Sequence, residues 1–344
     1  MSNSKKVLIL GLFVDASAKK QNIRTSDDRI AFMFAQNGIE IITSSAASSK
    51  FKRLIETAGT LVRKKDQYDV AIVSLFGTWP SFLWQEFITR LLKLFNKKII
   101  LCIRGGSIPE RIGSGASRFY TAIKRADKLV APSSYFGLYF EQKGFDVNII
   151  ENPVNLSLYQ FCKKEKIRPR IVWMRAFTDV YDPLMAVRVA KRLSEKYNDF
   201  EMVMAGKDGP VLQATKDLVK EYGLEDRIIF PGYINMQQKQ AFAKDYDIYL
   251  CTNKIDNTPV SLTEFMQFGL PIVSVNVGGI PYMIEDNVNG LLVNAGDYEA
   301  MFNKITLLIE DQTLAQSIIK NAYSYVQRYD EKNVLKKWKE LLHE

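Results

Sequence analysis

The sequence predicts an α/β protein with two doubly wound domains, each built on a parallel sheet. The chain has 344 residues, too many for one ordinary hydrophobic core and enough for two domains of about 150 to 200 residues. Apolar runs of strand length alternate with longer amphipathic segments in both halves. The runs are apolar at consecutive positions, which is typical of parallel strands covered on both faces.

Each half contains six such apolar runs. In the first half, a helical pattern at 26–38 follows the opening run, and we expect Ser26 to cap it and Gly38 to end it. The runs lie at 6–12, 38–45, 69–76, 97–103, 128–133 and 148–154, and then at 170–177, 200–206, 227–233, 247–252, 271–276 and 290–296.

A charged, proline-containing stretch at 151–170 separates the two sets of runs, and such a composition is typical of a domain boundary. We therefore predict a first domain at 1–155, a second domain at 156–325 and a terminal amphipathic helix at 326–344.

Composition excludes several classes of protein. No stretch approaches the roughly 18 to 20 apolar residues of a membrane-spanning helix. The three cysteines, Cys102, Cys162 and Cys251, are odd in number and widely spaced, which argues against a disulfide framework or a thiolate metal site and fits a reducing cytoplasm. The basic, apolar beginning could serve as a secretory signal, but we interpret it as the first buried strand.

The histidine count restricts the chemistry further. His343, the penultimate residue of this sequence, is the only histidine, so Ser-His-Asp triads, HExxH zinc sites and histidine general bases are almost excluded. Catalysis would have to depend on carboxylates, basic side chains, hydroxyls and backbone amides.

Positive charge is concentrated in the first domain. Residues 1–152 hold 23 Lys and Arg against 13 Asp and Glu, whereas 153–344 hold 24 against 25. This asymmetry predicts an anionic partner for the first domain, or it serves only solubility. The basic, aromatic-rich helix expected at 81–98 would suit an anionic membrane surface, or its apolar face would cover the sheet. We expect that face to contain Phe82, Leu83, Phe87, Leu91, Leu94 and Phe95.

Ligands of open parallel sheets bind at the carboxyl ends of the strands, so the loops after the strands carry the site predictions. The loop after the run at 97–103 offers Arg104, Gly105, Gly106 and Ser107. These residues suit the approach of an anion or a sugar on the acceptor side, or they form a plain surface loop. No GxGxxG motif supports a dinucleotide cofactor.

The second domain offers a more specific constellation. Arg175 ends a strand, where a guanidinium suits phosphate recognition. Thr258 is expected to cap a helix that begins at Pro259, and the free amides of Val260 and Ser261 would form an anion site.

Two carboxylates, Asp256 and Glu264, flank the start of this helix. Carboxylates beside a phosphate site repel it unless they bind hydroxyls. The pair therefore suits a nucleotide sugar, with the diphosphate on the amides and a hydroxyl-bearing ring on either side.

The segment from Arg175 to Asp297 resembles the donor-binding domain of glycosyltransferase family 4, the retaining enzymes of GT-B fold. The family's mark is a Glu, seven residues and a second Glu, followed by GLPIV and VGGIP-like turns, and "DNTPVSLTEFMQFGLPIVSVNVGGIP" matches this spacing. The resemblance implies a GT-B fold with a cleft between its domains and a terminal helix that returns to the first domain.

The resemblance also implies roles for residues. Glu264 would bind the ribose, Asp256 would face the donor sugar, and Arg175 would stabilise the leaving diphosphate, so that Asp256 and Arg175 carry catalysis. We expect Asn257, Thr258, Val260, Ser261, Lys254 and Tyr233 to complete the donor site.

Three departures from the family pattern stand out. Asp256 replaces the first Glu, Val180 occupies the position of an expected lysine, and Tyr282 follows the GGIP turn where many members have Glu. Lys254 is a candidate to replace the lost cation. The "DYD" at 245–247 is a weak metal motif, and we expect Asp247 to stabilise a helix-strand boundary.

The sequence thus predicts a hexosyltransferase-type enzyme that moves a sugar from a nucleotide-diphosphate donor, such as a UDP-sugar, to a saccharide, lipid-linked or other cell-surface glycan acceptor, with retention. No metal or other cofactor and no nucleic acid are expected. The protein would be cytoplasmic or peripheral at the inner face of a membrane. The alternative is a non-catalytic GT-B-like protein that holds an anionic partner.

Overall fold

The computed structural model divides the chain into two compact units. Unit 1 comprises Met1–Val154 and Tyr329–Glu344, and unit 2 comprises Asn155–Arg328. The structure describes residues 6–14, 25–47, 50–76, 79–104, 108 and 116–343.

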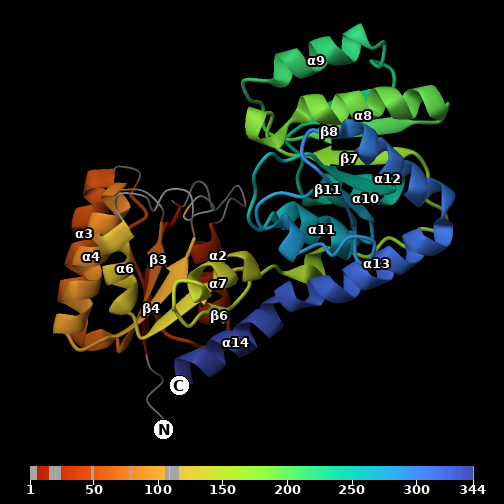
Figure 1. Ribbon diagram of the computed structural model, residues 1–344. Coiled ribbons are helices and arrows are strands. Elements are labelled where there is room, and N and C mark those ends of the chain that lie inside the picture. The colour runs from red at the N-terminus through yellow and green to blue at the C-terminus, as the bar shows by residue number, and fades with distance from the viewer. Residues whose placement is uncertain are drawn as a thin grey trace. The chain divides into compact units, whose positions relative to one another are not determined.

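Unit 1 is built on a six-stranded sheet in the order β2-β1-β3-β4-β5-β6 (Figure 1). All of its strand pairs are parallel, as expected for strands that are apolar on both faces. The strands are β1 (Val7–Leu10), β2 (Ile41–Thr43), β3 (Val70–Leu75), β4 (Lys98–Ile103), β5 (Lys128–Ala131) and β6 (Asn148–Ile149).

Helices cover both faces of this sheet. One core cluster joins the strands to α3, α4, α6 and α7, and a second joins them to α2 and α14. On that second face the ring of Trp338 packs edge-on against Phe34, with centroids 5.7 Å apart. The helices are α2 (Ser26–Gln36), α3 (Lys50–Arg63), α4 (Trp79–Leu94), α6 (Ala116–Lys124), α7 (Ser134–Glu141) and α14 (Glu331–His343).

Unit 2 repeats the plan with a six-stranded sheet in the order β12-β11-β10-β7-β8-β9, and its strand pairs are also parallel. The strands are β7 (Arg170–Met174), β8 (Glu201–Ala205), β9 (Ile228–Gly232), β10 (Ile248–Cys251), β11 (Ile272–Val275) and β12 (Leu291–Val293). The helices are α8 (Pro183–Lys196), α9 (Leu212–Glu221), α10 (Met236–Asp245), α11 (Val260–Phe268), α12 (Tyr298–Glu310) and α13 (Gln312–Val326).

This architecture confirms the predicted α/β class with two doubly wound parallel sheets, and each of the twelve predicted apolar runs contains one observed strand. Strand order reverses between β1 and β3 in unit 1 and between β7 and β10 in unit 2. Ligands of such sheets bind beyond the carboxyl ends of the strands at these switch points.

Two predicted helix caps are wrong. Thr25, not Ser26, caps α2, because its hydroxyl accepts from the Asp28 amide in a capping box. Pro259, not Thr258, precedes the first residue of α11, and no side chain caps that helix. The sequence offered a hydroxyl at both places, and only the backbone turn decides which residue is the cap.

The predicted apolar face of the helix at 81–98 is also wrong in part. In α4, Leu83, Phe87 and Leu94 are exposed, whereas Gln85 and Thr89 are buried. These two polar side chains tolerate burial because Gln85 donates to the Ser74 carbonyl at 3.2 Å and Thr89 to the Glu86 carbonyl at 3.1 Å. Among the described residues, no helix is long and apolar enough to cross a membrane.

Candidate functional site

Arg175 lies at the switch point of unit 2, directly after β7. Its side chain is 14% exposed and its Nη2 lies 3.0 Å from Oδ2 of Asp256, which is 19% exposed. The guanidinium also stacks on Tyr181, with its central carbon 5.1 Å from the ring centroid. The structure thus brings together the two residues that the sequence predicts to be catalytic.

Asp256 is held in place by its own loop. Its Oδ2 accepts from the Asn253 side chain at 2.8 Å, and its Oδ1 accepts from the Asn257 amide at 2.8 Å. A partly buried carboxylate with several donors keeps a fixed orientation, which a sugar-binding acid needs.

The paired glycines of the VGGIP turn pack against this loop. A Cβ at Gly278 would lie 2.1 Å from the Asp256 carbonyl oxygen, and one at Gly279 would lie 2.0 Å from that of Asn257. Gly279 also donates its amide to the Asp256 carbonyl at 2.9 Å. Only glycine allows so close an approach, so the turn fixes the backbone that carries Asp256.

Burial and neighbouring groups change the pKa values of Asp256 and Arg175. It raises the pKa of the Asp256 carboxyl, although Arg175 and the Asn257 amide oppose the shift. Burial by itself would lower the pKa of Arg175, but Tyr249, Cys251 and Asp256 together raise it above its ordinary value. The guanidinium therefore stays charged while the carboxylate binds a proton more readily than an ordinary aspartate.

Four buried polar atoms of the residues in this site lack a hydrogen-bond partner in the described part of the protein. They are Nε of Arg175, Oδ1 of Asn253, Oγ1 of Thr258 and Oγ of Ser261. Buried polar atoms are nearly always paired, so a concentration of unpaired ones at a switch point is typical of a ligand site.

The amino terminus of α11 adds backbone donors to this site. Because the first amides of a helix have no intrahelical acceptor, the amides of Val260 and Ser261 can donate to an anion, and the helix dipole favours negative charge there. Thr258 and Asn257 belong to the turn that leads into this helix.

Lys254 lies beside the position where the family resemblance expects a lysine. Its amide donates to the carbonyl of Val180 at 2.7 Å, and the neighbouring Thr252 hydroxyl donates to the Tyr181 carbonyl at 2.7 Å. The Lys254 ammonium pairs with the Asp179 carboxylate at 2.7 Å on the surface. The loop after β10 therefore places Lys254 next to the backbone of Val180.

Glu264 is buried in α11, and both of its oxygens accept hydrogen bonds. The Tyr159 hydroxyl donates to Oε1 and the Lys239 ammonium to Oε2, each at 2.8 Å. A ribose would have to share or displace one of these donors. No hydrogen bond within the described part of the chain joins Glu264 to Arg175 or Asp256.

The sequence interpretation missed Asn253, Tyr159 and Lys239. Asn253 directly follows a buried strand at the switch point, a position that could have indicated it. Tyr159 and Lys239 had no such signal, because their partner lies 105 and 25 residues away, respectively. Tyr233 follows β9 and its side chain is 70% exposed.

Unit 1 carries a second aspartate-arginine pair. Arg104, predicted on the acceptor side, follows β4, and its Nε donates to Oδ1 of Asp27 at 3.1 Å. The Arg104 Nη1 donates to Asn152 at 2.8 Å, and Asp27 also accepts from the Ser74 hydroxyl and the Leu12 amide. Gly105, Gly106 and Ser107 lie outside the described residues.

Asp247 of the "DYD" sequence is fully buried. Its carboxylate lies 2.6 Å from Nε of Arg168 and 3.2 Å from Nζ of Lys164. Lys164 also donates to the carbonyls of Ala243 and Lys244 at the end of α10, so the group stabilises a helix end. No cluster of three or more potential metal ligands occurs among the residues described.

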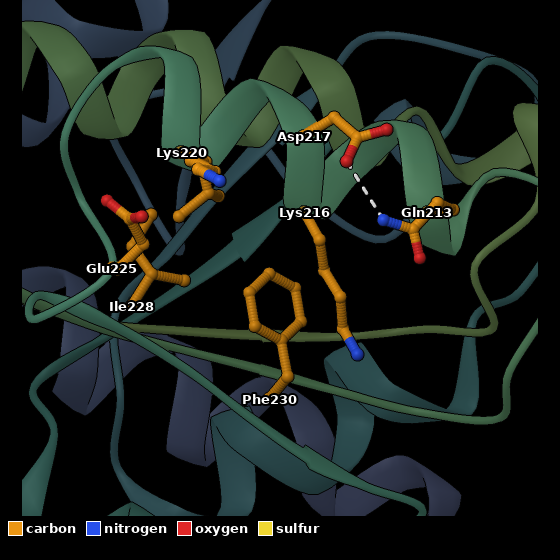
Figure 2. A pocket seen from close by; sticks show the side chains of 8 residues that line it. Gln213, Lys216, Asp217, Lys220, Glu225, Ile228 and Phe230 are labelled. Carbon is orange, nitrogen blue, oxygen red and sulfur yellow. Dashed lines mark hydrogen bonds between the residues drawn. The ribbon is translucent and has the colours of Figure 1, made fainter.

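A cavity of about 380 Å³ lies between α9 and β9 (Figure 2). Lys216 lies over the Phe230 ring, 5.7 Å from its centroid, and Gln213 donates to Asp217 at 2.9 Å. None of the predicted site residues lines this cavity, so it is distinct from the Arg175 site.

Comparison with known proteins shows what this site is similar to. Residues 161–325 match the family described as glycosyl transferases group 1. The matched segment lies within unit 2 and includes Arg175, Asp256 and Glu264.

Individual relatives of this chain are also named as glycosyltransferases. The chain is 24% identical over 225 residues to an uncharacterized glycosyltransferase of Haemophilus influenzae, covering 65% of this chain and 63% of that protein. It is 28% identical over 127 residues to the putative colanic acid biosynthesis glycosyltransferase WcaL of Escherichia coli, covering 35% of this chain and 31% of the relative. The chain therefore spans less than two thirds of the length of these relatives.

Among solved structures, Anabaena Alr3699/HepE in complex with UDP is similar over 98% of this chain and 99% of that one, with a TM-score of 0.73 and 17% sequence identity. At this identity the likeness shows the fold, and it confirms the predicted two-domain GT-B class.

Proposed function

We propose that this protein is a glycosyltransferase that transfers a sugar from a nucleotide-diphosphate donor to a glycan acceptor. The observation that carries the proposal is the Arg175–Asp256 pair at the switch point of unit 2, surrounded by buried polar atoms without partners. The match of residues 161–325 to glycosyl transferases group 1 supports the same chemistry.

In the proposed reaction the diphosphate lies on Arg175 and on the amides of Val260 and Ser261, and Lys254 leaves Asp179 to add a second cation. Charge develops on the phosphate oxygen as the bond from the anomeric carbon breaks. Donors fixed in advance around that oxygen stabilise the developing charge, and this electrostatic effect supplies most of the rate enhancement.

We further propose that the reaction retains the anomeric configuration. The acceptor hydroxyl forms the new bond on the face from which the diphosphate departs, and its proton passes to the departing phosphate oxygen. This route needs no histidine base. Asp256, in its hydrogen-bonded loop, would accept a hydrogen bond from a hydroxyl of the donor sugar. Glu264 would accept one from a ribose hydroxyl, which replaces the hydrogen bond from Tyr159 or Lys239.

The donor and acceptor classes follow from the named relatives. UDP is the proposed nucleotide because it is bound in the structural neighbour. A saccharide or lipid-linked glycan acceptor is proposed because WcaL is named for colanic acid biosynthesis. We propose a cytoplasmic protein, peripheral to a membrane, and a reaction without a metal, since Asp247 of the only DxD-like sequence is held by Lys164 and Arg168.

A panel of UDP-sugars and GDP-sugars tests the proposal. We expect one donor to be hydrolysed slowly without acceptor and to protect the protein against thermal unfolding, and Glu264→Ala to weaken nucleotide binding. The exposed Glu299→Ala, on α12, is the matched control. Protection without turnover by any donor would favour the non-catalytic alternative, and the absence of both effects would refute the proposal.

A further inference from the structure

Two neighbouring helices of unit 1 each expose an apolar stripe. On α3, Phe51, Leu54, Ile55 and Val62 are exposed, and on α4, Leu83, Phe87 and Leu94 are exposed. The most exposed are Leu94 at 78%, Phe51 at 74% and Ile55 at 57%. These seven residues are called the outer stripe below.

The α4 set has a spacing of four and then seven residues, and three members of the α3 set repeat it. At about 100° per residue, the α4 set falls within an arc of about 40° on its helix and the α3 set, with Leu54, within about 100°. Both helices follow one strand of a parallel sheet and lead to the next, so they run in the same direction. Both pack into the same core cluster, through Leu61 of α3 and Leu92 of α4 (Figure 1).

The outer stripe therefore forms an apolar area spread over two helices of one helical layer. Eleven residues of helix span about 16 Å. Monomeric proteins expose isolated apolar residues without consequence, but several on one side of a domain indicate an interaction surface.

Basic residues are frequent in the two segments that carry the outer stripe. The segments 50–67 and 79–98 hold ten Lys and Arg against three Asp and Glu, a net charge of +7 out of +9 for the whole chain. Lys52, Arg63 and Arg90 are exposed on the same two helices. Some of this charge is locally paired, as in the 2.7 Å contact between Arg90 and Glu86.

We infer that this surface of unit 1 docks on an anionic lipid bilayer, with the outer stripe entering the interface and the basic residues meeting the head groups. An apolar area with cations on the same two helices complements an anionic surface in both polarity and charge. A second copy of this chain would instead bring the same excess of positive charge against itself. The inference deepens the proposed function by naming the surface on which a lipid-linked acceptor would be reached, and it does not depend on nucleotide binding.

Co-sedimentation with vesicles tests the inference with the full chain. We expect binding to phosphatidylcholine vesicles that contain phosphatidylglycerol, weaker binding without it, and weaker binding at high salt. The paired variant Phe51→Ser/Phe87→Ser should reduce the partition coefficient more than tenfold. Arg63→Ser should reduce it about fivefold, since one basic residue near an anionic surface contributes about that factor.

The matched control is Ile229→Ser/Leu307→Ser, which removes two exposed apolar side chains from unit 2 and should leave vesicle binding unchanged. Thermal unfolding followed by circular dichroism and UDP affinity, measured on the Phe51→Ser/Phe87→Ser variant, should match the wild type. If neither the wild type nor the variants bind UDP, that result would count against the proposed function alone.

Three results would overturn the inference. Wild-type protein could remain in the supernatant with anionic vesicles, or the paired variant could bind as well as wild type. Sedimentation velocity could instead show a wild-type dimer that the paired variant dissociates, in which case the surface is a protein interface.

Discussion

Each unit carries an aspartate-arginine pair at the switch point of its sheet, and the two pairs have different surroundings. Asp27 and Arg104 of unit 1 are 3% and 8% exposed, and Asp27 accepts from three separate donors. Asp256 and Arg175 of unit 2 are 19% and 14% exposed, and within the described residues four buried polar atoms of this site lack hydrogen-bond partners.

This difference teaches how to separate a structural ion pair from a ligand site. The pair of unit 1 ties β3, β4 and the loop after β1 to the start of α2, and among the described residues Nη2 of Arg104 and Oε1 of the nearby Gln85 lack partners. Around the pair of unit 2, polar atoms of Arg175, Asn253, Thr258 and Ser261 lack partners. We expect the first pair to determine stability and the second to determine activity.

The largest expected effect is on stability, from Asp27→Ala. Removing this carboxylate leaves the guanidinium of Arg104 buried without its counterion, which costs about 3 to 5 kcal/mol. Urea unfolding should show this loss in the free energy of unfolding of unit 1. The exposed Glu40→Ala, which breaks the Lys6–Glu40 pair, should cost less than about 1 kcal/mol. Equal effects of the two substitutions would argue against the structural role.

The next effect is on turnover, from Arg175→Ala. Loss of a donor that stabilises a developing anion lowers kcat about 10²- to 10³-fold. Initial rates of UDP-sugar hydrolysis measure the change. The exposed Arg192→Ala, which removes a surface pair with Glu299, serves as the control and should keep wild-type rates. An Arg175→Ala enzyme of normal rate would disprove the assignment.

A smaller effect is expected from Asp256→Asn, which should lower kcat/KM about 10- to 100-fold by loosening the sugar. In the wild type, burial raises the pKa of Asp256, so lowering the pH protonates it above the ordinary value of about 3.9. Activity should therefore fall on the acid side, at a pH higher than for an ordinary aspartate. The pH profile of kcat/KM reports this group.

The acid limb should disappear in the Asp256→Asn profile, because asparagine does not titrate. If the limb persists unchanged, another group controls it and the role of Asp256 is refuted.

The smallest effect is expected from Lys254→Ala. An exposed cation contributes about 1 kcal/mol or less, so UDP affinity should fall no more than about fivefold. Val180→Lys in the same background should restore affinity, because the Lys254 backbone lies against Val180. Lys216→Ala, in the cavity between α9 and β9, is the control. Loss of affinity only in the Lys216→Ala variant would relocate the nucleotide to that cavity.

The fold was predictable because its signals are local. Six apolar runs per half and their spacing are enough to indicate two parallel sheets. The spacing of Asp256 and Glu264 predicts a donor site, and that assignment stays a prediction. The cap of α11 was not predictable, because Thr258 and Pro259 are adjacent and only the backbone turn distinguishes them.

Contacts between segments that lie far apart along the chain could not be predicted from the sequence either. Part of the apolar face expected on the helix at 81–98 is exposed, because Gln85 and Thr89 occupy buried positions and donate to main-chain carbonyls there. The pairing of Glu264 with Tyr159 and Lys239 depends on three elements that meet only in the folded chain.

Calorimetric titration of UDP and GDP tests the central claim most directly, because it measures how each aspartate-arginine pair affects the affinity for the same nucleotide. Wild-type protein should bind one of these nucleotides, Arg175→Ala should weaken that binding at least tenfold, and Arg104→Ala should leave it unchanged at temperatures where the protein stays folded. Failure of wild type to bind either nucleotide, or equal affinities in wild type and Arg175→Ala, would contradict the account.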